Sequence, residues 1–183
     1  MTLFQPILIL LCALLAVFWQ GAFPGIRHLL GAQIDLLPPL MVYAALSASL
    51  VTMTLLALVG GLMFDSLSAN PLGTSVLPLF LVGLAIHWRR DLILRDQFYA
   101  QFILGLLAST VAPALGVLLL LTLGQTPLLG WGSLWQWLVL AISGAVATPV
   151  LFAVFGWCYR ALGYRRVVET SFRPDREIRR GRN

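Results

Sequence analysis

The chain has 183 residues, of which 60% are hydrophobic and only 10% are charged, and its mean hydropathy is +0.91. An average soluble domain carries roughly 25% charged residues, so this composition excludes a soluble globular protein. All 12 basic residues are arginine and the net charge is +5, but the arginines lie beside long apolar runs, which argues against a nucleic-acid-binding protein.

The first apolar run, Leu3 to Gln20, contains no charged residue and has the length of about 20 residues that crosses a bilayer as a helix. A cleavable signal peptide also has an apolar segment, but it begins with basic residues and ends at a small-residue cleavage site. Met1 to Gln5 carries no charge, and Trp19 and Phe23 flank the end of the run. We therefore expect a retained membrane span.

The second apolar run, Leu36 to Phe64, follows Asp35, and its prolines Pro38 and Pro39 are typical of a helix start. One helix over these 29 residues would be about 43 Å long, against a hydrocarbon core of about 30 Å. Two half-length helices broken near residues 47–49 would fit better, provided that neighbouring helices shield the break. The single helix gives five spans in total and the pair gives six. Charge placement slightly favours five, and length favours six.

The most unusual segment runs from Gly60 to Gly73 and contains Asp65, the one acidic residue that apolar sequence flanks closely on both sides. At the end of a helix its negative charge opposes the macrodipole and needs a partner. Asn70 and Pro71 are typical of an N-cap and the first position of a new helix, whose backbone N–H groups would reach the Asp65 carboxylate. Gly61 lies on a small-residue face, which predicts close helix packing. We predict a structural turn motif of Gly61, Asp65, Asn70, Pro71 and Gly73, with a proton or cation site at Asp65 as the alternative.

The last two apolar runs, Gln97 to Leu123 and Leu134 to Tyr159, lie between two groups of arginines. The first group contains Arg89 and Arg90, and the second begins at Arg160. Because positive residues beside spans stay on the cytoplasmic side, both groups should face the cytoplasm, with an even number of spans between them.

Residues 162–183 form a strongly basic tail. Seven arginines, including Arg165 and Arg166, stand against three acidic residues and give this tail a net charge of +4. We expect residues 1–161 to form a transmembrane helix bundle and residues 162–183 to form a cytoplasmic tail. Such a segment is attracted to anionic lipid by about 1 kcal/mol per arginine near the surface, and a cytoplasmic protein partner is the alternative.

No pattern in the chain predicts a catalytic, cofactor or metal site. It contains no glycine-rich phosphate loop, nucleophile elbow or zinc-binding helix. Neither His28 nor His87 has a partner at metal-ligand spacing, and we expect both to be surface histidines.

Three features, in this order, resemble the MreD family of bacterial rod-shape proteins. The first is Asp35-Leu36-Leu37-Pro38-Pro39-Leu40. The second, and most specific, is Gly61-Leu62-Met63-Phe64-Asp65 with Asn70-Pro71-Leu72-Gly73. The third is the following hydrophobic span that ends in Arg89-Arg90. Length, hydropathy and the short basic tail agree over nearly the whole chain, although residues 173–182 match no family motif.

The resemblance implies an all-α, polytopic bundle of six transmembrane helices in the bacterial inner membrane, similar to the substrate-binding subunits of energy-coupling-factor transporters. It implies a non-enzymatic scaffold of the cell-wall elongation complex that binds MreC and helps to maintain rod cell shape. MreB, RodA and a class B penicillin-binding protein are the further partners that it implies. The alternative function is a small-molecule carrier or transporter subunit, which would need a polar pocket.

Overall fold

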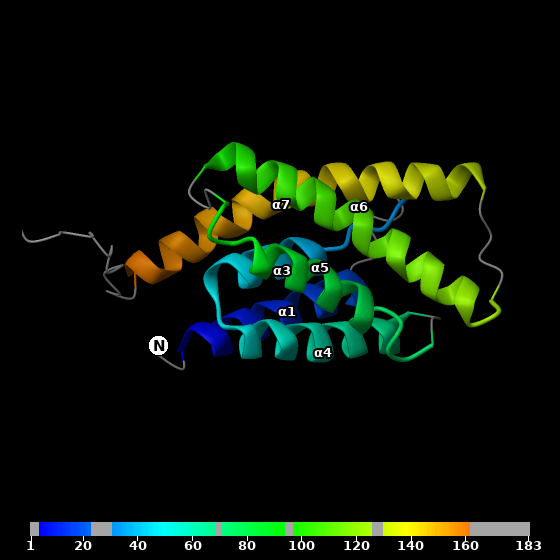
Figure 1. Ribbon diagram of the computed structural model, residues 1–183, viewed down its shortest axis with the longest axis horizontal. Coiled ribbons are helices and arrows are strands. Elements are labelled where there is room, and N and C mark those ends of the chain that lie inside the picture. The colour runs from blue at the N-terminus through cyan, green and yellow to red at the C-terminus, as the bar shows by residue number, and fades with distance from the viewer. Residues whose placement is uncertain (1–3, 23–30, 69–70, 94–96, 126–129, 162–183) are drawn as a thin grey trace, which may run out of the picture.

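The computed structural model describes residues 4–22, 31–68, 71–93, 97–125 and 130–161 (Figure 1). These ranges contain helices and no strand: α1 (Phe4–Ala22), α3 (Leu37–Ser47), α4 (Leu50–Leu67), α5 (Val76–Trp88), α6 (Phe98–Thr122) and α7 (Trp131–Ala161). α1, α4, α6 and α7 are long and apolar enough to cross a membrane, whereas α3 and α5 are shorter apolar helices. The prediction of an all-α helical bundle is confirmed, and the four long helices indicate a multi-pass membrane protein.

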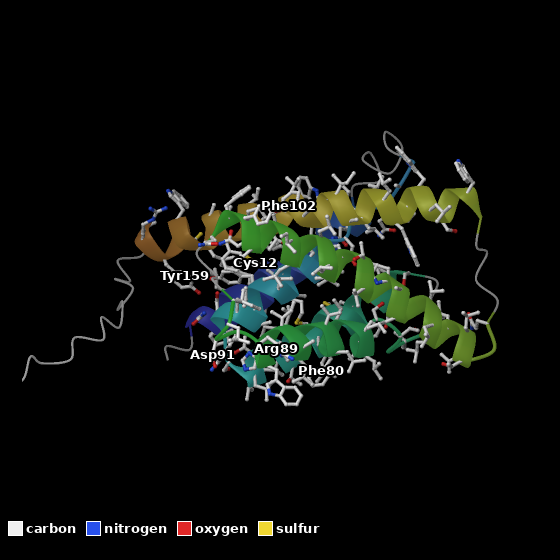
Figure 2. All side chains as sticks on the ribbon, turned by 45° about the horizontal axis from the view of Figure 1, so that its top comes forward. Cys12, Phe80, Arg89, Asp91, Phe102 and Tyr159 are labelled. Carbon is white, nitrogen blue, oxygen red and sulfur yellow. The ribbon has the colours of Figure 1, made fainter. Side chains whose placement is uncertain are left out.

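The helices alternate in direction along the long axis of the molecule (Figure 1). α1, α4 and α6 run one way, and α3, α5 and α7 run the other way, so Phe4 and Ala161 lie at the same end. Figure 2 places Arg89, Asp91 and Tyr159 at this end. It is called the Arg89 end below, and the opposite end, where α4 ends and α5 begins, is called the Asp65 end.

The predicted break in the second apolar run is confirmed. α3 ends at Ser47 and α4 begins at Leu50, with Ser49 as its N-cap, whose hydroxyl oxygen accepts a hydrogen bond from Thr52 N at 3.4 Å. The expectation of two half-length helices is wrong for α4, which has 18 residues. Of these two helices only α3 is short, because the break lies close to the two prolines at which α3 begins. Its 11 residues extend about 16 Å, roughly half of a hydrocarbon core.

The short helix α3 is the centre of the bundle. It contacts α1, α4, α5, α6 and α7, and Figure 1 shows it between the pair α1 and α4 and the pair α6 and α7. Every residue from Leu37 to Leu46 is buried. A helix that is apolar on all faces can be buried in this way without leaving a polar face to solvate. At its middle, the ring of Tyr43 stacks on Phe155 with centroids 4.2 Å apart. Long helices therefore shield the short one, as the six-span interpretation required.

The hairpin of α6 and α7 is held by a close backbone crossing. A Cβ added at Gly105 of α6 would lie 2.5 Å from the carbonyl oxygen of Gly144 in α7 and would overlap the side chain of Thr148. A Cβ at Gly144 would overlap the side chain of Ser109. Small residues allow this approach, and in a membrane the resulting van der Waals contact replaces the hydrophobic effect as the main attraction between helices.

We predict that Gly105→Ala lowers the free energy of unfolding by about 1–3 kcal/mol, because the added methyl group has to push the α7 backbone away. Gly156→Ala in α7 is the matched control, because nothing lies within 4 Å of its added Cβ. Removing a helical glycine there should raise stability by roughly 0.5–1 kcal/mol. Unfolding of both variants in detergent checks this, and equal effects of the two changes would contradict the close crossing.

Candidate functional site

Asp65 occupies the last turn of α4 and is almost completely buried, with 1% of its surface exposed. Its Oδ2 accepts hydrogen bonds from the backbone N–H of Gly73 at 2.8 Å and of Ser75 at 3.1 Å. A buried carboxylate needs such partners, because burying an unpaired charge is very unfavourable. Gly73 has φ +93°, a left-handed conformation that glycine adopts without steric cost. The Asp65 carboxylate therefore ties the end of α4 to the turn before α5.

The helix start expected at Pro71 is wrong. Residues 72–75 form a turn, and α5 begins at Val76. Pro71 instead closes this turn, since its carbonyl accepts hydrogen bonds from the backbone and the hydroxyl of Thr74. The predicted cap Asn70 lies outside the described residues. The donors that meet Asp65 are Gly73 in this turn and Ser75, the N-cap residue of α5, so the predicted contact with the start of the next helix forms at Ser75 and not at Asn70 or Pro71.

Gly61 lies where α4 meets the start of α5. A Cβ added there would stand 2.9 Å from the Cα of Val76 and 3.0 Å from its backbone nitrogen. The end of α4 and the start of α5 are thus held together at two places. One is the close backbone approach at Gly61, and the other is the Asp65 carboxylate one turn later. The Oδ1 of Asp65 is buried and has no hydrogen-bond partner among the described residues. One such oxygen falls short of a hard-cation site, which takes six or more oxygen ligands, so the geometry favours the structural role.

The N-terminus of α3 is stabilised by Asp35 and by its two prolines. The N–H of Leu37 donates to Oδ1 of Asp35 at 2.9 Å, and the N–H of Leu40 donates to the carbonyl of Leu36 at 3.1 Å. Pro38 and Pro39 between them have no N–H group. Three of the four positions that this helix start leaves without an intrahelical partner are therefore accounted for, at Leu37, Pro38 and Pro39. Asp35 is a cap that the sequence analysis missed, although an aspartate two residues before a double proline is a readable signal.

The C-terminus of α3 is satisfied by side chains from two other helices. Gln5 of α1 donates from Nε2 to the carbonyl of Ser47 at 2.7 Å. His87 of α5 lies with Nδ1 at 2.9 Å from the carbonyl of Ala45, so Nδ1 carries the proton and donates it. His87 is half-buried, and the expectation of a solvated surface histidine is wrong. Each partner is 42 residues away in the chain, and no local signal in the sequence indicates either bond.

A cavity of about 230 Å³ lies at the Asp65 end, beside the start of α3. Polar lining comes from the segment before α3, the turn before α5, and α7, and apolar lining comes mainly from α5 and α6. The lining residues include Gln33, Asp35, Ser75, Leu79, Gly116 and Gln136. The Gln136 amide donates to the carbonyl of Gln33 at 2.8 Å and accepts from its N–H at 3.0 Å. These two hydrogen bonds fix the segment before α3 against α7.

Burial beside this cavity raises the pKa of Asp35 to about 6, although the hydrogen bond from Leu37 and the nearby Gln20 amide act in the opposite direction. The cause is desolvation of the carboxylate, which disfavours its charged form. The charge state of Asp35 therefore responds to mildly acidic pH.

The basic residues expected on the cytoplasmic side lie at the Arg89 end where they are described. Arg89 and Arg90 are exposed, and Arg90 pairs loosely with Asp91 at 3.7 Å. An exposed pair of this kind adds little stability. Arg165, Arg166 and the rest of the tail lie outside the described residues. Among the described residues, no group of three or more histidine, cysteine, aspartate or glutamate side chains could hold a metal ion.

We predict that Asp65→Ala lowers the free energy of unfolding by about 2–4 kcal/mol, because two backbone donors lose a charged acceptor. Asp65→Asn keeps an oxygen acceptor and should lose clearly less. Unfolding in detergent compares the two variants. An Asp65→Ala variant as stable as the wild type would contradict the stabilising role of the Asp65 carboxylate in this turn.

Stability should also depend on pH through Asp35. The pKa is raised from 3.8 to about 6 by folding, so the stabilising contribution is complete below pH 3.8 and is lost as pH rises through about 6. Asp35→Asn keeps the acceptor for Leu37 N–H and removes the titration. The melting temperature of the wild type should therefore fall relative to that of Asp35→Asn between pH 4 and 7, whereas parallel curves would refute the pKa shift.

Comparison of the chain with known protein families, curated proteins and solved structures finds no match. No family model matches the chain, and neither a curated protein nor a solved structure is significantly similar to it.

Proposed function

We propose that this protein is a non-enzymatic membrane scaffold of the bacterial cell-wall elongation complex, which binds MreC and helps to maintain rod cell shape. The proposal starts from the resemblance of three sequence features to the MreD family. MreB, RodA and a class B penicillin-binding protein are the further components that we expect in the same complex.

The observation that carries the proposal is how the bundle uses its polar side chains. Gln5, Asp35, Asp65, His87 and Gln136 all bind backbone groups at the ends of helices or in the segments beside them. Side chains engaged in this way fix the relative positions of the helices. A scaffold needs a rigid shape and an exposed apolar surface for a partner span, and it needs no reacting group.

We propose that the protein lies in the bacterial inner membrane and that its Arg89 end faces the cytoplasm. Arg89, Arg90 and Arg160 lie at that end, and positive residues beside spans stay cytoplasmic. Trp88 and Trp131, which are 84% and 87% exposed, stand at opposite ends, where tryptophan anchors helices at the two membrane interfaces. With α3 and α5 counted as short spans inside the bundle, the chain crosses six times, as in the substrate-binding subunits of energy-coupling-factor transporters.

The alternative function, a small-molecule carrier or transporter subunit, has one observation in its favour. The cavity beside Asp35 combines apolar walls with a few polar groups, which is the usual composition of a ligand pocket. Its volume of about 230 Å³ is smaller than the roughly 300–1,000 Å³ of most ligand pockets. The scaffold proposal therefore stands first.

The test is a detergent pull-down of the tagged protein from its native membrane, with proteins and lipids identified by mass spectrometry. We expect MreC in near-stoichiometric amount, with the other elongation proteins in smaller amounts. A tagged multi-pass protein of another pathway is the control. Recovery of ATPase subunits in place of MreC would contradict the scaffold and support the carrier.

The same experiment separates the two expected roles of the chain. Deleting residues 163–183 should reduce the co-purified anionic lipid, because arginines near a membrane surface each contribute about 1 kcal/mol of attraction to anionic headgroups. MreC recovery should stay unchanged, since we assign MreC binding to the transmembrane bundle. Loss of MreC on deletion would show that the tail takes part in partner binding.

A further inference from the structure

The cavity at the Asp65 end lies where two helices separate. α6 and α7 cross closely at Gly105 and Gly144 and then diverge toward the Asp65 end (Figure 1). Beyond the crossing, Pro113 and Gly116 of α6 and Leu140 of α7 line the cavity. No atom lies within 4 Å of where a Cβ of Gly116 would stand, so the absence of a side chain there leaves space unfilled.

Not all polar groups on the cavity wall are already paired. The amide of Gln136 is engaged on both sides by the backbone of Gln33. The Asp35 carboxylate accepts, among the described residues, the hydrogen bond from Leu37 N–H at Oδ1. The Gln20 amide is also close enough to lower the pKa of this carboxyl, but a carboxylate has about four lone-pair sites and can accept further hydrogen bonds. The Ser75 hydroxyl, which also lines the cavity, can accept one as well.

Charge selects the kind of group that these acceptors fit. The described arginines, Arg89, Arg90 and Arg160, lie at the opposite end of the bundle, so they do not neutralise Asp35. Among the residues that the structure describes, an anion would meet a carboxylate here and no positive side chain. A divalent metal ion would need six or more oxygen ligands, and the cavity lining as a whole is mostly apolar. A group with N–H donors and a positive charge matches the wall best, because charge-assisted hydrogen bonds to a carboxylate are strong.

The rest of the cavity fits an apolar chain. Its apolar lining includes Leu79 of α5, Val117 and Leu120 of α6 and Leu140 of α7. A ligand with a charged head and a hydrocarbon chain would therefore place each part against matching surface. Burial of the chain contributes about 0.8 kcal/mol per CH₂ group, which offsets the loss of freedom on binding.

We propose that this cavity binds the primary ammonium group of an amphiphile, with the nitrogen at Asp35 and Ser75 and the hydrocarbon chain along α6 and α7. The ligand is either a free alkylamine or the ethanolamine headgroup of a phospholipid, which share this chemistry. The proposal is argued from the cavity alone and does not rest on MreC binding, so its failure would leave the scaffold proposal standing.

The test uses the full chain in maltoside detergent at pH 7.5, with n-hexylammonium as the probe and hexan-1-ol as the uncharged probe of the same length. At about ten times its Kd, hexylammonium should raise the melting temperature of the wild type by roughly 3–6 °C. Asp35→Asn, which keeps the cap of α3, should weaken hexylammonium binding roughly ten- to hundredfold.

Two glycine variants show whether the probe occupies this cavity. Gly116→Leu fills it and should abolish the response to hexylammonium. Gly156→Leu is the matched control, because Gly156 also has open space around its Cβ position but does not line the cavity, and it should respond like the wild type. Both variants are expected to fold, since neither added Cβ meets another atom within 4 Å.

Native mass spectrometry of the protein purified from its own membrane distinguishes the two ligand sources. Phosphatidylethanolamine that is retained by the wild type, lost in Gly116→Leu and displaced by hexylammonium would identify the lipid. Binding of hexylammonium with no retained phosphatidylethanolamine would indicate a free amine. The proposal is overturned if hexan-1-ol stabilises as strongly as hexylammonium, if Asp35→Asn or Gly116→Leu still responds like the wild type, or if no ammonium compound binds.

Discussion

The bundle depends on the burial of α3, an 11-residue helix that other helices surround. Water cannot reach its ends freely, so each unpaired backbone group there has to find a partner in the protein. Asp35 and two prolines satisfy the first turn, and Gln5 and His87 satisfy carbonyls of the last turn. These contacts join α1, α5 and the segment before α3 to a single central helix. These bonds position α1 and α5 against α3, and close packing such as the crossing at Gly105 and Gly144 positions α6 against α7.

The need to pair buried backbone groups also explains which polar side chains are hydrogen-bonded to the backbone and which polar atoms remain available to a ligand. Asp65 satisfies the turn between α4 and α5 in the way that Asp35 satisfies the start of α3. Gln136 fixes the segment before α3 against α7, which completes the wall of the cavity at the Asp65 end. The Asp35 carboxylate can accept further hydrogen bonds beyond the one that caps α3, and this carboxylate gives the cavity its charge preference. A rigid bundle with one small amphiphilic pocket is compatible with a scaffold that responds to lipid or amine, and it is also what a simple carrier would need.

Much of the fold could be predicted from local sequence. The break near residues 47–49 and the start of α3 at its double proline are local properties, and the structure confirms them, whereas the length of α4 exceeds the predicted half-length helix. The start of α5 was misplaced because Asn70-Pro71 is as typical of a turn as of a helix start, and the choice depends on the contact with Asp65. The contacts of Gln5 and His87 and the crossing of Gly105 and Gly144 could not be predicted, because each joins residues about 40 positions apart and leaves no periodic signal. The cavity depends on the divergence of α6 and α7, which is a property of packing and not of either helix alone.

Backbone amide hydrogen exchange of the protein in lipid nanodiscs tests the central position of α3 most directly. Helices exposed to lipid also exchange slowly in their middle, so the informative amides are those near the ends of the helices. The account predicts that the amides of Leu37, Leu40 and Ala48 exchange much more slowly than those in the last turns of α5 and α6, because buried partners satisfy the ends of α3. Exchange of these three amides at the rate of the other helix ends would show that water reaches α3, and would contradict the account.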